Sequence, residues 1–146
     1  MLRLHPDIYR EAWIQSKAQD IDIYLLLAVW WVESKFNPNA VGDTNRSFGM
    51  GQLYQGGAGA GRSGAELLDL TTNAEMSAAY LARMIQATGS EYDGVSAYNQ
   101  GLGGWEERGQ KGNPAYWVAV KNMRERLAAE GVARMGYPEL FYLWEK

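Results

Sequence analysis

The chain of 146 residues is 47% hydrophobic and 21% charged, a balance that predicts one globular domain spanning residues 1–146. Its formal net charge of −3 argues against a nucleic-acid partner, because nucleic-acid-binding surfaces are basic. The absence of cysteine excludes disulfides, and the single histidine, His5, excludes a paired-histidine zinc site. His5 is expected to be a surface or capping residue, and neither a metal nor a cofactor is expected.

Two helices are predicted at the start of the chain. Helical periodicity over residues 7–19 indicates the first, and a second begins after Asp20 or Asp22 and ends near Ser34. The second is almost wholly apolar over residues 23–32. Such a helix is normally buried, and this run is shorter than the roughly 20 apolar residues that span a bilayer. We therefore expect a core helix and no membrane insertion.

The last turn of this core helix carries a single carboxylate, Glu33. Apolar surroundings raise the pKa of a carboxyl group, and the partial negative charge of a helix C-terminus acts in the same direction. A carboxylic acid that keeps its proton near neutral pH is suited to general acid catalysis. The alternative interpretation is a helix-end glutamate that turns to solvent.

Residues 39–64 are rich in Gly, Asn, Ser and Asp and are predicted to form a loop, with a short helical turn over residues 49–54. The glycines of residues 56–61 do not form a phosphate-binding loop, because no strand precedes them and the Lys-Ser/Thr pair is absent. They are expected to form a mobile loop or lid beside a cleft. A calcium loop starting at Asp43 is excluded because Phe48 replaces its essential glycine.

Further helices are predicted in the second half of the chain. A capping-box pattern at residues 72–75 starts a helix that ends near Thr88, and residues 94–100 form a shorter helix. Pro114 begins a long helix that ends at residue 130, and the apolar segment 138–145 docks on the body. The apolar stripe expected on the first of these helices comprises Met76, Ala79, Tyr80, Met84 and Ala87. These elements predict an all-α, bundle-like domain.

Three polar clusters follow from this arrangement. They are Glu33-Ser34 at a helix end, a glycine-containing turn at residues 48–53, and Ala-Tyr-Asn-Gln-Gly at residues 97–101. Glycines allow close backbone approach, and the amide of Gln52 can donate and accept hydrogen bonds. An acid, amides and tyrosines around a cleft suit a polyhydroxylated, N-acetylated substrate.

The order and spacing of these clusters resemble those of lytic transglycosylases and goose-type lysozymes. These enzymes cleave peptidoglycan glycan strands between N-acetylmuramic acid and N-acetylglucosamine. Their sequence pattern consists, in order, of Glu-Ser, Asn-Pro-x-Ala, Gly-x-x-Gln, Asn, Ala-Tyr-Asn-x-Gly and Tyr-x-x-x-Val. In the same order, the matching residues here are 33–34, 37–40, 49–52, Asn73, 97–101 and Tyr116 with Val120. The resemblance spans about residues 22–120 and implies an all-α, lysozyme-like fold.

The resemblance also implies roles for individual residues. Glu33 would be the general acid and then the base, and Tyr116 would orient it. The substrate's own acetamide and 6-hydroxyl would replace a second carboxylate and give a 1,6-anhydro product. The implied substrate-binding residues are Ser34, Ser47, Phe48, Met50, Gln52, Tyr98, Asn99 and Tyr116.

Two departures from the family pattern bear on the cleft, one in the turn itself and one in the segment after Gln52, where the glycine-rich loop replaces the usual helical segment. The common Leu-Met pair of the turn is replaced by Met50-Gly51, so we expect a shallower groove wall at Gly51. Asp43 matches a goose-type position thought to position water, but a further goose-type Asp is replaced by Tyr54. Asp43 either supports hydrolysis or only caps the loop, and a catalytically silent glycan-binding module is a further alternative.

The expected partner is the peptidoglycan glycan strand, bound by a monomer. The N-terminal segment lacks the continuous apolar core of a signal peptide. Together with the missing cysteines and the small size, this suggests a bacteriophage or prophage enzyme. Such an enzyme would be released from the host cytoplasm through a holin, or would be carried in the virion. An excised domain of a longer protein is the alternative.

Overall fold

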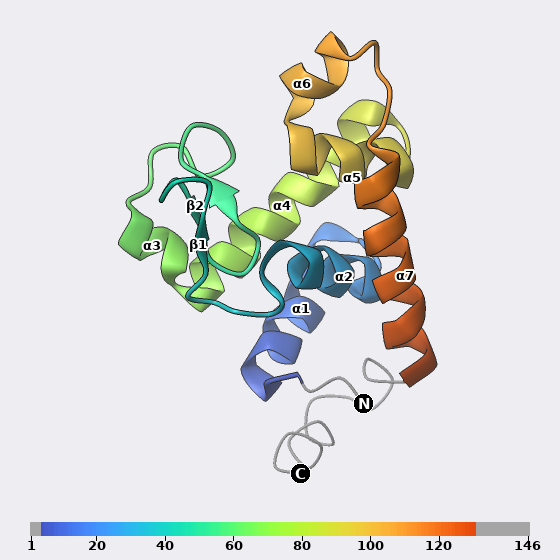
Figure 1. Cartoon of the computed structure of the whole chain (residues 1–146). Coiled ribbons are helices and arrows are strands. Elements are labelled where there is room, and N and C mark those ends of the chain that lie inside the picture. Colours follow the sequence, from blue (N-terminus) through green and yellow to red (C-terminus); the bar gives the residue numbers. More distant parts are fainter. Residues whose placement is uncertain (1–3, 131–146) are drawn as a thin grey trace.

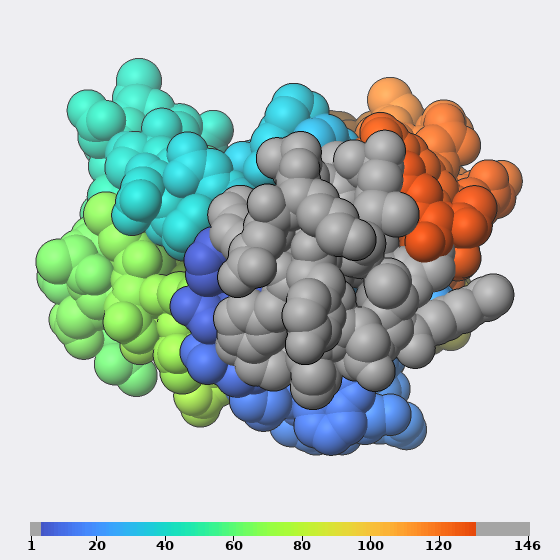
Figure 2. Space-filling model, turned by 90° about the horizontal axis from the view of Figure 1, so that it is seen from below, coloured from blue at the N-terminus to red at the C-terminus, as the bar shows by residue number. Residues whose placement is uncertain are grey.

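The computed structural model describes residues 4–130, and helices dominate this part of the chain. The helices are α1 (Pro6–Gln19), α2 (Ile23–Ser34), α3 (Gly64–Leu68), α4 (Leu70–Thr88), α5 (Glu91–Gln100), α6 (Leu102–Glu107) and α7 (Pro114–Glu130). Figure 1 shows α2 in the middle of the molecule, with α7 on one side and a small sheet on the other. The view from below in Figure 2 likewise places the segment containing the sheet and α7 at opposite sides. The predicted all-α fold class is confirmed.

Helix α2 is buried on every side along its middle, as its apolar sequence predicts. The side chains of residues 25–30 are all fully shielded from solvent. Asp22 caps the helix by accepting a hydrogen bond from the backbone of its first turn, whereas Asp20 ends α1 in a left-handed conformation. Lys35, also left-handed, ends α2. Glu33 therefore lies in the last turn of the most buried helix.

Helix α4 begins earlier and buries a different face than its apolar pattern predicts. Its N-cap is Asp69, which accepts a hydrogen bond from the Thr72 N–H at 2.9 Å, so the predicted cap at Thr72 is wrong. A capping box is present instead at Ser63, at the start of α3. Internal hydrogen bonds hold the polar residues Asn73 and Ser77 on the buried face. The buried residues are Asn73, Ala74, Ser77, Ala78, Leu81 and Met84, of which only Met84 belongs to the predicted stripe.

Residues 41–54 form a small antiparallel sheet, so the predicted helical turn in this segment is wrong. The strands β1 (Val41–Gly42), β2 (Ser47–Phe48) and β3 (Leu53–Tyr54) pair in the order β1-β2-β3. The turn between β1 and β2 has positive φ angles at Asp43, Thr44 and Asn45. Asp and Asn tolerate this conformation better than most residues. Strands of two residues are too short to produce a visible alternation in the sequence.

Helix α7 begins at Pro114, as predicted, and packs along α2. The Arg124 guanidinium donates to a carboxylate oxygen of Asp22 at 2.8 Å and to both carboxylate oxygens of Glu91 at 2.9 and 3.3 Å. These ion pairs tie the C-terminal half of α7 to the starts of α2 and α5. The N-terminal turn of α7 then lies beside the end of α2, where Tyr116 reaches Glu33.

The remaining elements differ from the predictions mainly in length. Helix α5 starts at Glu91 behind the cap Ser90, earlier than the predicted residue 94, and the short α6 is not predicted. The predicted docking of residues 138–145 lies outside the described residues. Within residues 4–130, no helix is both long and apolar enough to cross a bilayer.

Candidate active site

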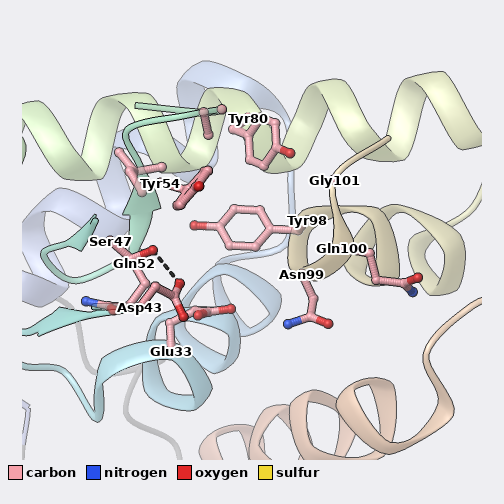
Figure 3. A pocket seen from close by; sticks show the side chains of 13 residues that line it. Glu33, Asp43, Ser47, Gln52, Tyr54, Tyr80, Tyr98, Asn99, Gln100 and Gly101 are labelled. Atoms are coloured by element: carbon pink, nitrogen blue, oxygen red, sulfur yellow. Dashed lines mark hydrogen bonds between the residues drawn. The ribbon is translucent and has the colours of Figure 1, made fainter. Parts of the chain in front are cut away.

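A cavity of about 380 Å³ lies where the end of α2, the small sheet, α4 and α5 meet (Figure 3). Its lining residues are Glu33, Asp43, Ser47, Gln52, Leu53, Tyr54, Gly57, Ala58, Tyr80, Tyr98, Asn99, Gln100 and Gly101. Segments far apart in the sequence thus form one concave surface. The predicted site residues that line it are Glu33, Asp43, Ser47, Gln52, Tyr98 and Asn99.

Glu33 lines the cavity from the last turn of α2 rather than projecting into open water. Burial raises the pKa of its carboxyl group to about 7, and the nearby charge of Asp43 acts in the same direction. A hydrogen bond from Tyr116 opposes both effects, because it stabilises the carboxylate. A group with this pKa can donate a proton near neutral pH and take one back.

Tyr116 holds the Glu33 carboxyl group from the first turn of α7. Its hydroxyl donates a hydrogen bond to Oε2 of Glu33. Burial and the neighbouring Glu33 charge raise the pKa of Tyr116 well above its ordinary value, so the phenol stays a neutral donor. Tyr116 therefore lies beside Glu33 as predicted, but it is not among the residues that line the cavity.

Asp43 and Ser47 line the cavity on the side of the small sheet. The Ser47 hydroxyl donates a hydrogen bond to Oδ2 of Asp43, which lies in the left-handed turn between β1 and β2. Figure 3 shows the carboxylate groups of Asp43 and Glu33 on the same side of the cavity. Asp43 is thus well placed to influence proton chemistry at Glu33.

Gln52 lines the cavity, but its amide nitrogen is used within the fold. Nε2 donates to the backbone carbonyls of Ala40 at 3.1 Å and Gly49 at 3.0 Å. These bonds hold the turn between β2 and β3, where Gln52 itself has a positive φ of 50°. Gln52 can therefore offer its side-chain oxygen to a ligand as an acceptor, whereas its nitrogen stabilises the turn.

Tyr98 contributes its ring to the cavity rather than its hydroxyl. The hydroxyl is buried and donates to the carbonyl of Gly51 at 2.7 Å, so it is used within the fold. The ring of Tyr80 lies 5.2 Å from that of Tyr98, and Tyr54 lies on the same wall (Figure 3). Sequence reasoning assigned Tyr80 to the core, and aromatic enrichment is the signal that points to this wall.

The described residues contain no cluster of His, Cys, Asp or Glu that could hold a metal ion. The chain matches the sequence profile of the family described as Transglycosylase SLT domain over residues 12–119, a range that contains every residue lining the cavity. The chain belongs to this family. A comparison with curated proteins gave no significant match. As a transglycosylase SLT domain, the protein acts on peptidoglycan, and the resemblance found in the sequence is confirmed.

Besides Tyr116, three residues that the resemblance implies as substrate contacts in this SLT domain lie outside the cavity lining. Ser34 donates its hydroxyl to the carbonyl of Met50 at 2.7 Å, which joins the end of α2 to the β2–β3 turn. The Met50 side chain is fully buried in the core. The Phe48 ring packs against Gly64, where the Cβ of any larger residue would lie 2.8 Å from the ring. All three residues support the β2–β3 turn or its surroundings, and none of them lines the cavity.

Gly51 does not make the groove of the SLT domain shallower, because it is buried behind the wall. Its N–H donates to Oδ1 of Asn73 at 2.8 Å, and a Cβ at this position would lie 2.5 Å from Cβ of Ser77. The nitrogen of the Asn73 side chain donates to the carbonyls of Phe48 at 2.8 Å and Leu67 at 2.7 Å. Gly51 thus permits close contact between the turn and α4.

The glycine-rich segment forms part of the wall of the SLT domain beside the cavity, where Gly57 and Ala58 line it. Backbone hydrogen bonds fold the segment onto itself and onto the sheet. The Gly59 N–H donates to the carbonyl of Tyr54 at 2.8 Å, and the Gln55 N–H donates to that of Arg46 at 2.9 Å. The predicted location beside a cleft is therefore found, and the predicted mobility stays a prediction.

Proposed function

We propose that this transglycosylase SLT domain cleaves the β-1,4 bond between N-acetylmuramic acid and N-acetylglucosamine with Glu33 as its catalytic acid. One observation carries the proposal: Glu33 lines a cavity, and its pKa is raised to about 7. A carboxyl group in this state is protonated in a useful fraction of molecules at neutral pH.

The reaction begins when Glu33 gives its proton to the glycosidic oxygen and the bond from that oxygen to C1 of N-acetylmuramic acid breaks. The acetamide oxygen of the same sugar bonds to C1 and takes the place of an enzyme nucleophile. The 6-hydroxyl then attacks C1 and displaces the acetamide oxygen, and its proton passes to the Glu33 carboxylate. The product carries a 1,6-anhydro ring, and Glu33 is again protonated.

Asp43 supports a second candidate reaction, in which water replaces the 6-hydroxyl. Asp43 lines the same cavity and its charge raises the pKa of Glu33. A carboxylate in this position can orient and activate a water molecule that attacks C1. The product of this hydrolysis has a reducing end instead of an anhydro end.

Mass spectrometry of the material released from purified peptidoglycan tests both reactions. Anhydro ends are expected from wild-type protein, and reducing ends would replace the first proposal with hydrolysis. Glu33→Gln is expected to release no fragments, and full activity in this variant would remove Glu33 from the mechanism. Absence of release by correctly folded wild-type protein would instead favour a catalytically silent glycan-binding module.

The biological setting is also a proposal. The chain functions as a single domain and a monomer of bacteriophage or prophage origin, and it reaches the wall through a holin or as part of the virion. The proposed origin is based on the absence of cysteine from the sequence. Detection of the protein in purified virions would support the virion route, and its absence there would favour release by a holin.

A further inference from the structure

Asn113 connects two residues of the candidate site, although it does not line the cavity itself. It precedes α7, and its backbone N–H donates to the buried hydroxyl of Ser96 in α5 at 2.8 Å. Its side chain contacts the Tyr116 backbone N–H at 3.3 Å and the Asn99 side chain at 2.9 Å. One amide group therefore bridges the cavity residue Asn99 and the residue that holds Glu33.

The orientation of this amide follows from the chemistry of its partners. A backbone N–H can only donate, so the Asn113 atom that faces the Tyr116 N–H must be the oxygen. The nitrogen of Asn113 then faces Asn99 and donates, so the Asn99 atom that receives this bond must be its oxygen. Each choice fixes the next, and the direction of both side-chain amides is determined by one backbone group.

The consequence appears at Asn99. With its oxygen engaged by Asn113, Asn99 presents its nitrogen to the cavity. Figure 3 shows this nitrogen on the side of Glu33 and the oxygen turned away from it. Asn99 is exposed, so the nitrogen is accessible to a ligand. The site therefore offers a hydrogen-bond donor here, which suits an acceptor oxygen such as the carbonyl of a sugar acetamide.

We propose that Asn113 is a positioning residue that makes Asn99 a hydrogen-bond donor toward an acceptor oxygen of the glycan. The proposal rests on the proposed function for the identity of the glycan. The sequence signal for Asn113 is its position before Pro114, where a helix-capping residue is favoured. Capping alone explains its contact with the Tyr116 backbone, whereas the bond to Asn99 serves no helix.

The test measures the dissociation constant of peptidoglycan glycan strands freed of stem peptides, in a Glu33→Gln background that prevents turnover. Asn113→Asp keeps the cap on α7 but has only acceptor oxygens, so Asn99 must turn its nitrogen toward residue 113 and its oxygen toward the cavity. We expect the dissociation constant to rise about tenfold, which is the loss of one good hydrogen bond. Asn113→Ser keeps the cap without a charge and is expected to raise it about threefold.

A double-mutant cycle with Asn99→Ala separates this role from a structural one. In that background, Asn113→Asp is expected to change the dissociation constant by less than about twofold. An equal effect in both backgrounds would overturn the proposal, because a charge effect or a distorted helix does not depend on Asn99. No effect of either Asn113 variant with Asn99 present would also overturn it. Asn122→Asp, an exposed change on the same helix, is the control for added charge.

The cycle is independent of catalysis, so its failure and the failure of the proposed function are distinguishable. Failure of the folded wild-type protein to release fragments from peptidoglycan would contradict the proposed function and leave the coupling between Asn99 and Asn113 measurable. Thermal unfolding of each variant verifies that the fold is intact before its dissociation constant is compared.

Discussion

The hydroxyl of Tyr116 donates a hydrogen bond to a carboxylate oxygen of Glu33, which joins two residues that lie 83 positions apart. The bond stabilises the charged carboxylate, whereas burial and Asp43 destabilise it. The pKa of about 7 is the balance of these opposing effects. The contributions of Tyr116 and Asp43 can each be removed by a nearly isosteric substitution, and the direction of each change in pKa is defined.

Tyr116→Phe is expected to raise the pKa of Glu33, because the bond that favours the carboxylate is lost. The basic limb of the pH profile of kcat/KM reports this pKa if Glu33 must be protonated, so the limb should move up by about 0.5–1 pH unit. Activity at the optimum should fall about tenfold, because the carboxyl group loses its orienting partner. Turnover of peptidoglycan as a function of pH measures both effects, and a limb that moves down would contradict the assignment.

Asp43→Asn is expected to have the opposite effect on the same limb. Removing the negative charge lowers the pKa of Glu33, and the limb should move down by about 0.5–1 pH unit. The asparagine oxygen can still accept the hydrogen bond from Ser47, so the turn should keep its shape. A profile identical to that of the wild type would mean that the two carboxyl groups do not interact. Unchanged product ends would show that Asp43 is not needed to position water.

Glu33→Gln is expected to stabilise the fold at high pH. Because burial raises the pKa, the folded protein binds this proton more tightly than the unfolded chain, and wild-type stability falls as the pH rises from 4.5 to about 7. The neutral glutamine has no such dependence. Between pH 4 and pH 8 the free energy of unfolding should change by about 3 kcal/mol in favour of the variant. Urea denaturation at several pH values measures the difference in free energy of unfolding between the variant and the wild type. A difference that does not vary with pH would refute the raised pKa of Glu33. The exposed substitution Glu75→Gln should show no such trend.

Gly51→Ala is expected to lower the free energy of unfolding by about 2 kcal/mol, because overpacking of a buried site costs this much. The added Cβ would lie 2.5 Å from Cβ of Ser77 and 2.7 Å from the Tyr98 hydroxyl. The matched control is Gly103→Ala in α6, where the added group would meet no atom within 4 Å beyond its chain neighbours and the backbone of its own helix. The control should be neutral or stabilise by up to about 1 kcal/mol. Equal effects of the two substitutions in chemical denaturation would contradict the close packing at Gly51.

Parts of the fold are predictable from the sequence where one strong local pattern acts alone. The apolar run over residues 23–32 predicts α2, and Pro114 predicts the start of α7. The apolar pattern of α4 predicts the wrong face because Asn73 and Ser77 are polar yet buried, each in a hydrogen bond to a residue distant in the sequence. The small sheet is set by its turns, and strands of two residues leave no periodicity to detect.

The candidate site likewise has features that are predictable from the sequence and features that are not. Motif order identifies Glu33 as the candidate acid and places Gln52 and Tyr98 around it. It does not tell which atoms face the cavity, because those directions depend on contacts between elements. The Tyr98 hydroxyl turns to Gly51, and the Ser34 hydroxyl turns to Met50. Such pairings arise only when distant segments meet, so they could not be read from either segment alone.

Because residues 25–30 are completely buried, we expect α2 to open to solvent far less often than the glycine-rich surface segment does. Amide protons of this helix should exchange with solvent only through global unfolding, whereas those of residues 56–61 are held by local bonds that open on their own. Glu33, the proposed acid, is thus anchored in the helix that is expected to exchange most slowly, whereas Gly57 and Ala58 of the surface segment line the same cavity. Under the proposed function, we expect sequence variation in that segment to alter which glycans are accepted without loosening Glu33.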